Sequence, residues 1–220
     1  MSVREVFQRE LSKLRESLLR MARLVEAEIA DALGALRNFD RAAADKVRLN
    51  DQAVNELLRH IREQVFDVIA TQQPVASDLR LLMGVQFVAI ELERMGDYAV
   101  RIARRTATLA GLPHETLLPE LGLMGQLASQ QVRDILDALI EDDATRARKV
   151  AGKDAEVDRL YDRIFDKLID GCGSELNAEE SLRTVLLINV AHSLERVGDR
   201  VVNVAEEVVF LDSGKVVELD

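Results

Sequence analysis

Residues 92–97 read Leu92-Glu93-Arg94-Met95-Gly96-Asp97, and residues 194–199 read Leu194-Glu195-Arg196-Val197-Gly198-Asp199. Between residues 92–103 and residues 194–205, seven of twelve positions are identical. Two unrelated amphipathic helices would share their apolar spacing, but not a Glu, an Arg, a Gly and an Asp in one register. The match therefore indicates the duplication of a helical unit.

The duplication extends toward the N-terminus, where the shift between equivalent positions is 103 residues instead of 102. One deleted loop residue would produce this difference. Under the longer shift, Asp40 falls on Asp143, Val47 on Val150, Asp51 on Asp154, Val54 on Val157 and Ile61 on Ile164.

Apolar residues recur at spacings of three and four almost throughout the chain, which predicts an all-α protein. We expect six long helices, over residues 4–37, 40–70, 77–110, 120–140, 143–169 and 178–209. Asp40, Ser77 and Asn177 are the expected N-caps, the last in a capping box with Glu180. All three prolines are placed in loops. The two three-helix repeats should span residues 4–110 and 115–212.

Composition excludes several classes of protein. Hydrophobic residues make up 48% and charged residues 31%, which is not the balance of a disordered chain. Aromatic residues make up only 4%, which argues against a β-sandwich or barrel. The net charge of −10 disfavours nucleic acid and anionic lipid as partners.

A cytosolic location is expected. The first 20 residues are rich in charge, so they lack the apolar region of a signal peptide, and no segment is apolar enough to span a bilayer. The single cysteine, Cys172, lies in an expected loop and has no partner for an internal disulfide.

Acidic pairs four residues apart mean little in a chain in which 39 of 220 residues are acidic. These pairs, however, recur at equivalent positions. Glu93 and Asp97 match Glu195 and Asp199, and Asp154 and Asp158 match Asp51 and Asn55.

At about 100° per residue, each acidic pair lies at the edge of an apolar helix face. Antiparallel packing would bring two such edges to one groove, where four side-chain oxygen groups converge. Converged anions repel unless a cation lies among them, and oxygen ligands suit Mg²⁺, Mn²⁺, Ca²⁺ or ferric iron. Zinc is less expected, and a solvated flank with intrahelical ion pairs is the alternative that the residues leave open.

The two candidate metal sites differ in one ligand. Asn55 offers a neutral oxygen where the second repeat has Asp158. Because affinity for hard cations rises with ligand charge, the second site is expected to bind more tightly. Close helix approach beside the acidic groove would explain Gly96 and Gly198, since glycine is unfavourable inside a helix.

The sequence gives little support for histidine-based metal sites or for catalysis. The three histidines, His60, His114 and His192, share no repeat position, and His192 is interpreted as a packed or capping residue. A diiron bundle needs Glu-x-x-His, and Gly96 and Gly198 hold the histidine position. No phosphate-binding glycine loop and no nucleophile–base grouping can be found. The sequence predicts no catalytic residues.

The chain resembles the PhoU family of phosphate transport system regulatory proteins over about residues 4–211. The most specific stretches are Gln73-Pro74-Val75-Ala76-Ser77-Asp78-Leu79-Arg80 and the Leu92–Val100 segment, with a second copy at Ser181-Leu182-Arg183 and Leu194–Asp199. The resemblance implies two tandem three-helix bundles of up-down-up type, with surface clusters of iron or zinc. It implies a first site of Asp51, Glu93 and Asp97, weakened at Asn55. It implies a second site of Asp154, Asp158, Glu195 and Asp199.

The resemblance also implies a negative regulator of the phosphate-starvation response that is not an enzyme. Such proteins link the ATPase subunit of the phosphate ABC importer to a sensor histidine kinase, and many are homodimers. They reach the membrane only through these partners. Two alternatives stay open: a metal-dependent all-α nucleotide pyrophosphohydrolase, and a structural helical bundle without metal.

Overall fold

The computed structural model describes residues 3–113, 117–171 and 177–219, and within these ranges every regular element is an α-helix. The helices are α1 (Val3–Asn38), α2 (Arg41–Asn50), α3 (Gln52–Gln72), α4 (Ser77–Leu109), α5 (Pro119–Glu141), α6 (Ala144–Ala151), α7 (Asp154–Asp170) and α8 (Ala178–Ser213). The all-α fold expected from the periodicity is confirmed. Cys172 and His114 lie outside the described residues.

Two of the six expected helices are interrupted. The helix expected over residues 40–70 is broken at Asp51, and the one expected over residues 143–169 is broken at Gly152 and Lys153. At both breaks the chain tightens locally, because some backbone N–H groups bond three residues back. Val54 N donates to Asp51 O, and Lys153 N donates to Val150 O. The apolar period runs through both breaks, so the sequence pattern did not reveal them.

Most of the expected helix starts are confirmed. Asp40 Oδ1 accepts a hydrogen bond from the backbone N–H of Ala43, and Asn177 forms the full capping box with Glu180. Two expectations are wrong. Ser77 lies inside the first turn of α4, because the turn after the Gln73–Pro74 segment places Ala76 at the cap position. Pro119 is the first residue of α5, a position that needs no N–H donor.

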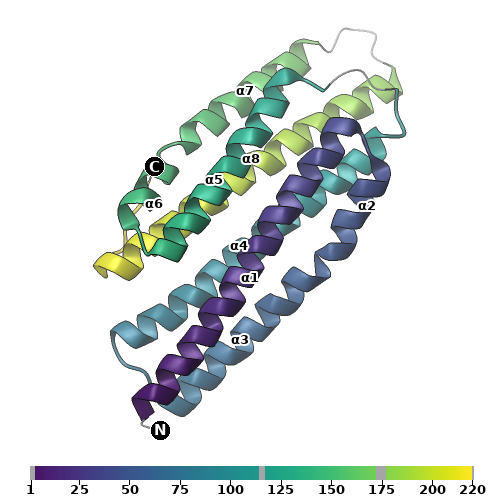
Figure 1. Ribbon diagram of the computed structural model, residues 1–220. Helices are drawn as coiled ribbons and strands as arrows, with labels where there is room; N and C mark the ends of the chain where they lie inside the picture. Colours follow the sequence, from purple (N-terminus) through teal and green to yellow (C-terminus); the bar gives the residue numbers. More distant parts are fainter. Residues whose placement is uncertain (1–2, 114–116, 172–176, 220) are drawn as a thin grey trace.

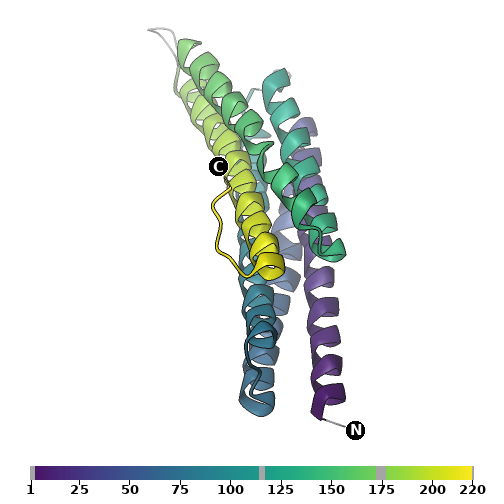
Figure 2. The ribbon, with the colours of Figure 1, turned by 90° about the vertical axis from the view of Figure 1, so that its left-hand side faces the viewer.

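The helices form two three-helix bundles that lie side by side and are offset along their length (Figure 1). One contains α1, α2 with α3, and α4; the other contains α5, α6 with α7, and α8. A view from the side shows an elongated molecule, with the N-terminus at the far end of the first bundle (Figure 2). In the described part of the chain, no helix is long and apolar enough to cross a membrane.

Helices α4 and α8 run antiparallel and join the two bundles. A methyl group on Gly84 of α4 would lie 2.7 Å from the Leu211 side chain near the end of α8. At the other end, Arg105 Nη2 donates to Asn189 Oδ1 at 3.4 Å. Both helices bury most of their apolar residues, so their contact merges the two bundle cores into one.

The C-terminal segment folds back along α8, as Figure 2 shows. The backbone N–H of Leu219 donates to Glu206 Oε1 at 2.9 Å, and Val217 and Leu219 pack against the core. Val216 stays exposed.

Candidate functional site

Asp51 lies where α2 ends and α3 begins, and its side chain makes no capping hydrogen bond. Its Oδ2 accepts a hydrogen bond of 2.7 Å from Nδ2 of Asn55, one turn later. Its Oδ1 faces α4, where a methyl group on Gly96 would lie 3.5 Å away. The carboxylate therefore reaches α4, and the glycine leaves room for it.

Glu93 and Asp97 are one turn apart on α4, beside its buried face. The pKa of Glu93 is raised by burial and by repulsion from Asp97 and Asp51. The pKa of Asp51 is raised by burial and by Asp97, against the lowering effects of Asn55 and Arg104. The structure thus brings the predicted residues of the first repeat into one another's electrostatic field.

An open hollow lies in front of Glu93 and Asp97. Its volume is about 460 Å³, and its lining residues are Glu93, Arg94, Asp97, Tyr98, Arg101 and Arg200. Solvent and ions can therefore reach this acidic cluster from the surface.

The second repeat repeats the arrangement around Asp154, the first residue of α7. Burial, together with the charges of Asp158, Asp199 and Glu195, raises the pKa of Asp154 to about 6. A methyl group on Gly198 of α8 would collide with Oδ1 of Asp154. Each repeat therefore places an aspartate carboxylate from a helix break over a glycine of its long third helix.

The carboxyl groups of Asp158 and Glu195 respond to the same field. The pKa of Asp158 is raised by burial and by Asp199 and Asp162. The pKa of Glu195 is raised by burial and by Asp199, although Arg196 and His192 oppose the shift. All four predicted residues of the second site therefore lie together between α7 and α8.

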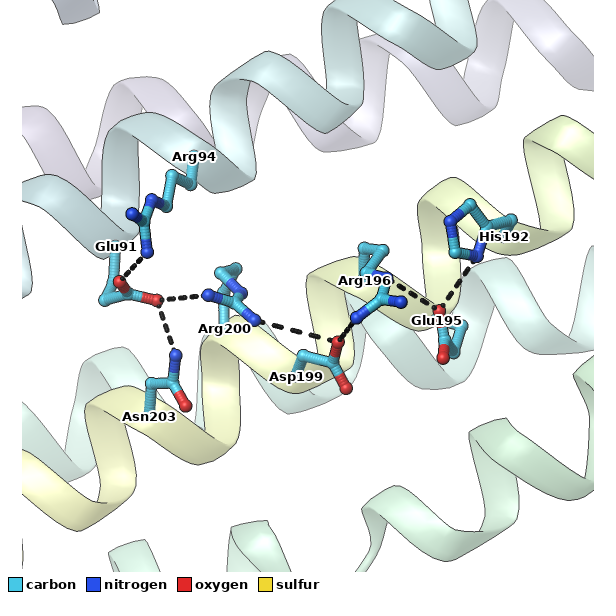
Figure 3. A network of polar contacts seen from close by, with 8 residues as sticks. All are labelled: Glu91, Arg94, His192, Glu195, Arg196, Asp199, Arg200 and Asn203. Carbon is cyan, nitrogen blue, oxygen red and sulfur yellow. Dashed lines mark hydrogen bonds and ion pairs between the residues drawn. The ribbon is translucent and has the colours of Figure 1, made fainter.

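Arginines partly neutralise the α8 carboxylates (Figure 3). Arg196 Nη1 donates to Asp199 Oδ2 at 2.8 Å, and Arg200 lies 3.7 Å from the same oxygen. Nδ1 of His192 lies 3.2 Å from Glu195 Oε2. The His192 ring lies 6.0 Å from that of Tyr161, but its side chain is 46% exposed, so His192 is only partly packed.

Sequence reasoning missed Glu28. This residue of α1 is only 4% exposed, and its Oε2 is buried without a hydrogen-bond partner. The same oxygen lies 3.0 Å from the place of a methyl group on Gly96, next to Asp51 Oδ1. Burial and the charges of Asp51 and Asp31 raise its pKa to about 7. The missed signal is an acidic residue within an apolar helix stripe that includes Val25, Ile29 and Ala32.

The repeat partner of Glu28 is Gln131, at the shift of 103 residues. Gln131 is 3% exposed, and its Nε2 donates to Asp154 Oδ1 at 3.5 Å. Counting Glu28, each repeat contributes four carboxylates. The expectation of tighter binding at the second site rests on three carboxylates against four, and therefore on leaving Glu28 out of the first site.

The donor atoms fit a hard cation. Glu28 Oε2 and Asp51 Oδ1 are buried oxygens without a hydrogen-bond partner, and a cation would supply what they lack. Among the described residues, no three His, Cys, Asp or Glu side chains already form a group that could hold a metal ion. The carboxylates come close enough to repel, and binding would require their side chains to rotate toward one another to close a coordination sphere.

A family model described as the PhoU domain matches residues 18–106 and again residues 121–208. Each match lies within one of the two bundles. The family model thus finds the duplication that the sequence shows by itself.

Two relatives match over most of their length. The phosphate-specific transport system accessory protein PhoU homolog of Clostridium acetobutylicum is 35% identical over 218 residues, which is 99% of each chain. The phosphate-specific transport system accessory protein PhoU of Escherichia coli is 34% identical over 209 residues, covering 95% of this chain and 86% of that one.

Solved structures agree. The crystal structure of PhoU from Pseudomonas aeruginosa matches with a TM-score of 0.89 and 35% identity, over 95% of this chain and 100% of that one. The phosphate transport system regulatory protein PhoU from Streptococcus pneumoniae matches with a TM-score of 0.88 and 28% identity, over 97% and 100%. On this sequence and structural evidence, the chain belongs to the PhoU family.

Proposed function

We propose that this chain is a regulatory accessory protein of a phosphate-specific transport system and acts by protein contact, not by catalysis. The observation that carries the proposal is the likeness, over nearly the whole chain, to relatives described as accessory proteins of that system. The similar Streptococcus pneumoniae structure is described as a regulatory protein.

The finer proposal is a negative regulator that links the importer's ATPase subunit to a sensor histidine kinase. The long helices support a role in protein contact, because they expose apolar side chains at helical spacing. Leu79, Met83 and Phe87 lie four residues apart on α4 and are 38%, 50% and 38% exposed. Such a stripe is typical of a surface that binds another protein.

The regulatory role is tested by deleting the gene and measuring a reporter for phosphate-starvation genes in phosphate-rich medium. Loss of the protein should derepress the reporter, and a plasmid copy should silence it again. A reporter that stays silent in the deletion strain would contradict the proposal. Copurification of the importer's ATPase subunit and of the kinase with the tagged chain tests the two contacts separately.

We further propose that each repeat holds one or more hard cations between its second and third helical segments. The support is the gathering of carboxylates and the buried oxygens without partners. Iron, zinc, Mg²⁺ and Mn²⁺ are the candidates, and elemental analysis of protein purified without added ions would identify the native metal.

Removing both α8 ligands, Glu195→Ala with Asp199→Ala, should abolish metal at the second centre yet leave the helices folded. The apo state also loses repulsion, since burial and neighbouring acids raise the pKa of Glu195. Circular dichroism and metal per chain are the measurements.

The matched control is Glu63→Ala with Asp67→Ala, an exposed pair at the same spacing on α3. The control should keep its full metal content. Equal metal in the wild type and in the α8 variant would contradict the second centre, and unfolding without metal loss would favour a purely structural role.

A further inference from the structure

Glu28 is the most deeply buried carboxylate at either centre. Its residue is 4% exposed, whereas Asp97 and Asp158 lie at the surface. Its unpartnered Oε2 points at the same glycine surface of α4 that Asp51 Oδ1 faces. An ionised carboxylate in such a place is costly unless a cation or a donor meets it.

The second repeat has a different residue at the position equivalent to Glu28. Gln131 replaces the acid by an amide, and the amide donates to Asp154, the residue equivalent to Asp51. In the first repeat, the buried position holds an acid, Glu28, and the position one turn after Asp51 holds an amide, Asn55. In the second repeat, the buried position holds an amide, Gln131, and the position one turn after Asp154 holds an acid, Asp158. The acid and the amide have exchanged places between the repeats.

We propose that Glu28 is a ligand of the first metal centre and supplies from α1 the carboxylate that Asn55 lacks. The inference rests on the proposed function, in that the centres must bind cations. The two centres then carry equal ligand charge. The first centre takes its carboxylates from α1, from the junction of α2 and α3, and from α4, whereas the second takes them from α7 and α8 alone. Glu28 Oε2 and Asp51 Oδ1, which both face Gly96, would hold the cation of the first centre from α1 and from the junction of α2 and α3.

The test isolates the first centre in a parent protein that carries Glu195→Ala and Asp199→Ala. Mn²⁺ is titrated into the apo protein, and free Mn²⁺ is followed by electron paramagnetic resonance. Because affinity follows the number of charged ligands, Glu28→Gln should weaken binding at least about tenfold. Adding Asn55→Asp to Glu28→Gln gives the first repeat the ligand set of the second, and it should restore the affinity.

The matched control is Glu26→Gln, which removes a charge from α1 two residues away, and it should change the affinity less than about threefold. If the parent and the wild type both fail to bind Mn²⁺, the proposed metal function fails and the inference with it. If the parent binds but Glu28→Gln binds equally well, the inference alone is overturned, and Glu28 is a protonated core residue.

The reciprocal exchange tests the same idea when Glu28→Gln does not fold. In a parent with Glu93→Ala and Asp97→Ala, Asp158→Asn should weaken the second centre. Gln131→Glu added to Asp158→Asn should restore it, because the acid then reaches Asp154 from α5 as Glu28 reaches Asp51 from α1. Failure of this restoration in a folded protein would overturn the inference.

Discussion

Gly198 of α8 and Gly34 of α1 both lie inside helices, where glycine is about 1 kcal/mol less favourable than alanine. A methyl group on Gly34 meets no atom within 4 Å, so Gly34→Ala should raise the free energy of unfolding by up to about 1 kcal/mol. On Gly198 the methyl group would collide with Asp154 Oδ1. Gly198→Ala should therefore gain little stability and should lose metal at the second centre.

Urea denaturation of the two apo variants measures the difference, and metal per chain measures the displacement of Asp154. Gly34→Ala serves as the control for helix propensity. If Gly198→Ala gained as much stability as Gly34→Ala and kept its metal, the close contact between Gly198 and Asp154 would be wrong.

Glu207 of α8 offers a pH-dependent test away from both centres. Burial raises its pKa, because the charged form is poorly solvated beside Gly84. Above that raised value the ionised group destabilises the fold, and the penalty disappears as the pH falls through the raised pKa toward the ordinary value. Glu207→Gln should therefore raise the melting temperature at pH 7 and have less effect at pH 4.5. A difference that grows as the pH falls would contradict this reading.

Residue identity alone predicted one part of each candidate site and missed the other. Glu93, Asp97, Glu195 and Asp199 stood out because both repeats keep the acidic type at the same register. Glu28 did not, because its partner is Gln131, and the two residues differ in charge while sharing a buried position. Only the packing of α1 against α4 shows that Glu28 reaches Gly96.

At the scale of elements, a buried carboxylate joins the long helices of the two repeats. Glu91 of α4 is 1% exposed and accepts hydrogen bonds from Arg94, Arg200 and Asn203, at 2.7, 3.2 and 2.8 Å (Figure 3). Arg200 and Asn203 belong to α8, and Arg200 also lies near Asp199 of the second centre. The contact between the repeats therefore continues into the polar groups of the proposed second metal centre.

Glu91→Ala should lower the free energy of unfolding by about 3 kcal/mol, because it removes the buried acceptor of Arg94, Arg200 and Asn203. The largely buried Arg200 guanidinium then keeps only the longer contact to Asp199, at 3.7 Å. Ser193→Ala is the matched control, since Ser193 occupies the equivalent position on α8 and bonds only to the Asn189 carbonyl one turn back. The control should cost less than about 1 kcal/mol. Urea denaturation compares the two, and equal losses would show that the inter-repeat ion pair adds no stability.

Helix ranges followed from the sequence, whereas helix breaks did not. Outside the two breaks, the expected helix ends lie within a few residues of the observed ones, because caps, prolines and the apolar period mark them. The breaks at Asp51 and at Gly152 keep that period, so they leave no trace in the apolar pattern. They bring Asp51 and Asp154 to helix junctions beside α4 and α8. Each candidate site is therefore built at a helix break, and the apolar periodicity does not predict such breaks.

At the scale of the whole molecule, the duplication does not give two independent halves. The buried faces of α4 and α8 pack on each other, and α1 of the first bundle also contacts α5 of the second. Polar contacts fix the register, with Glu91 held from α8 and Arg105 bonded to Asn189. Separating the repeats would expose one face of each long helix and would leave Glu91 with Arg94 as its remaining partner, without the donors from α8. Folding should therefore be cooperative across both repeats.

The chain provides its own reporters for this cooperativity, because it has no Trp and only two Tyr. Tyr98 lies on α4 in the first repeat, and Tyr161 lies on α7 in the second. Tyr161→Phe leaves fluorescence from the first repeat alone, and Tyr98→Phe leaves it from the second alone. In urea, the tyrosine fluorescence of each variant should change at the same midpoint as its own helix signal by circular dichroism, since the shared core unfolds in one step. Glu91→Ala in each background should move both midpoints together. If the midpoints of the two reporters separate in otherwise intact chains, the bundles unfold independently, and the contact between α4 and α8 is only a weak interface between two self-sufficient domains.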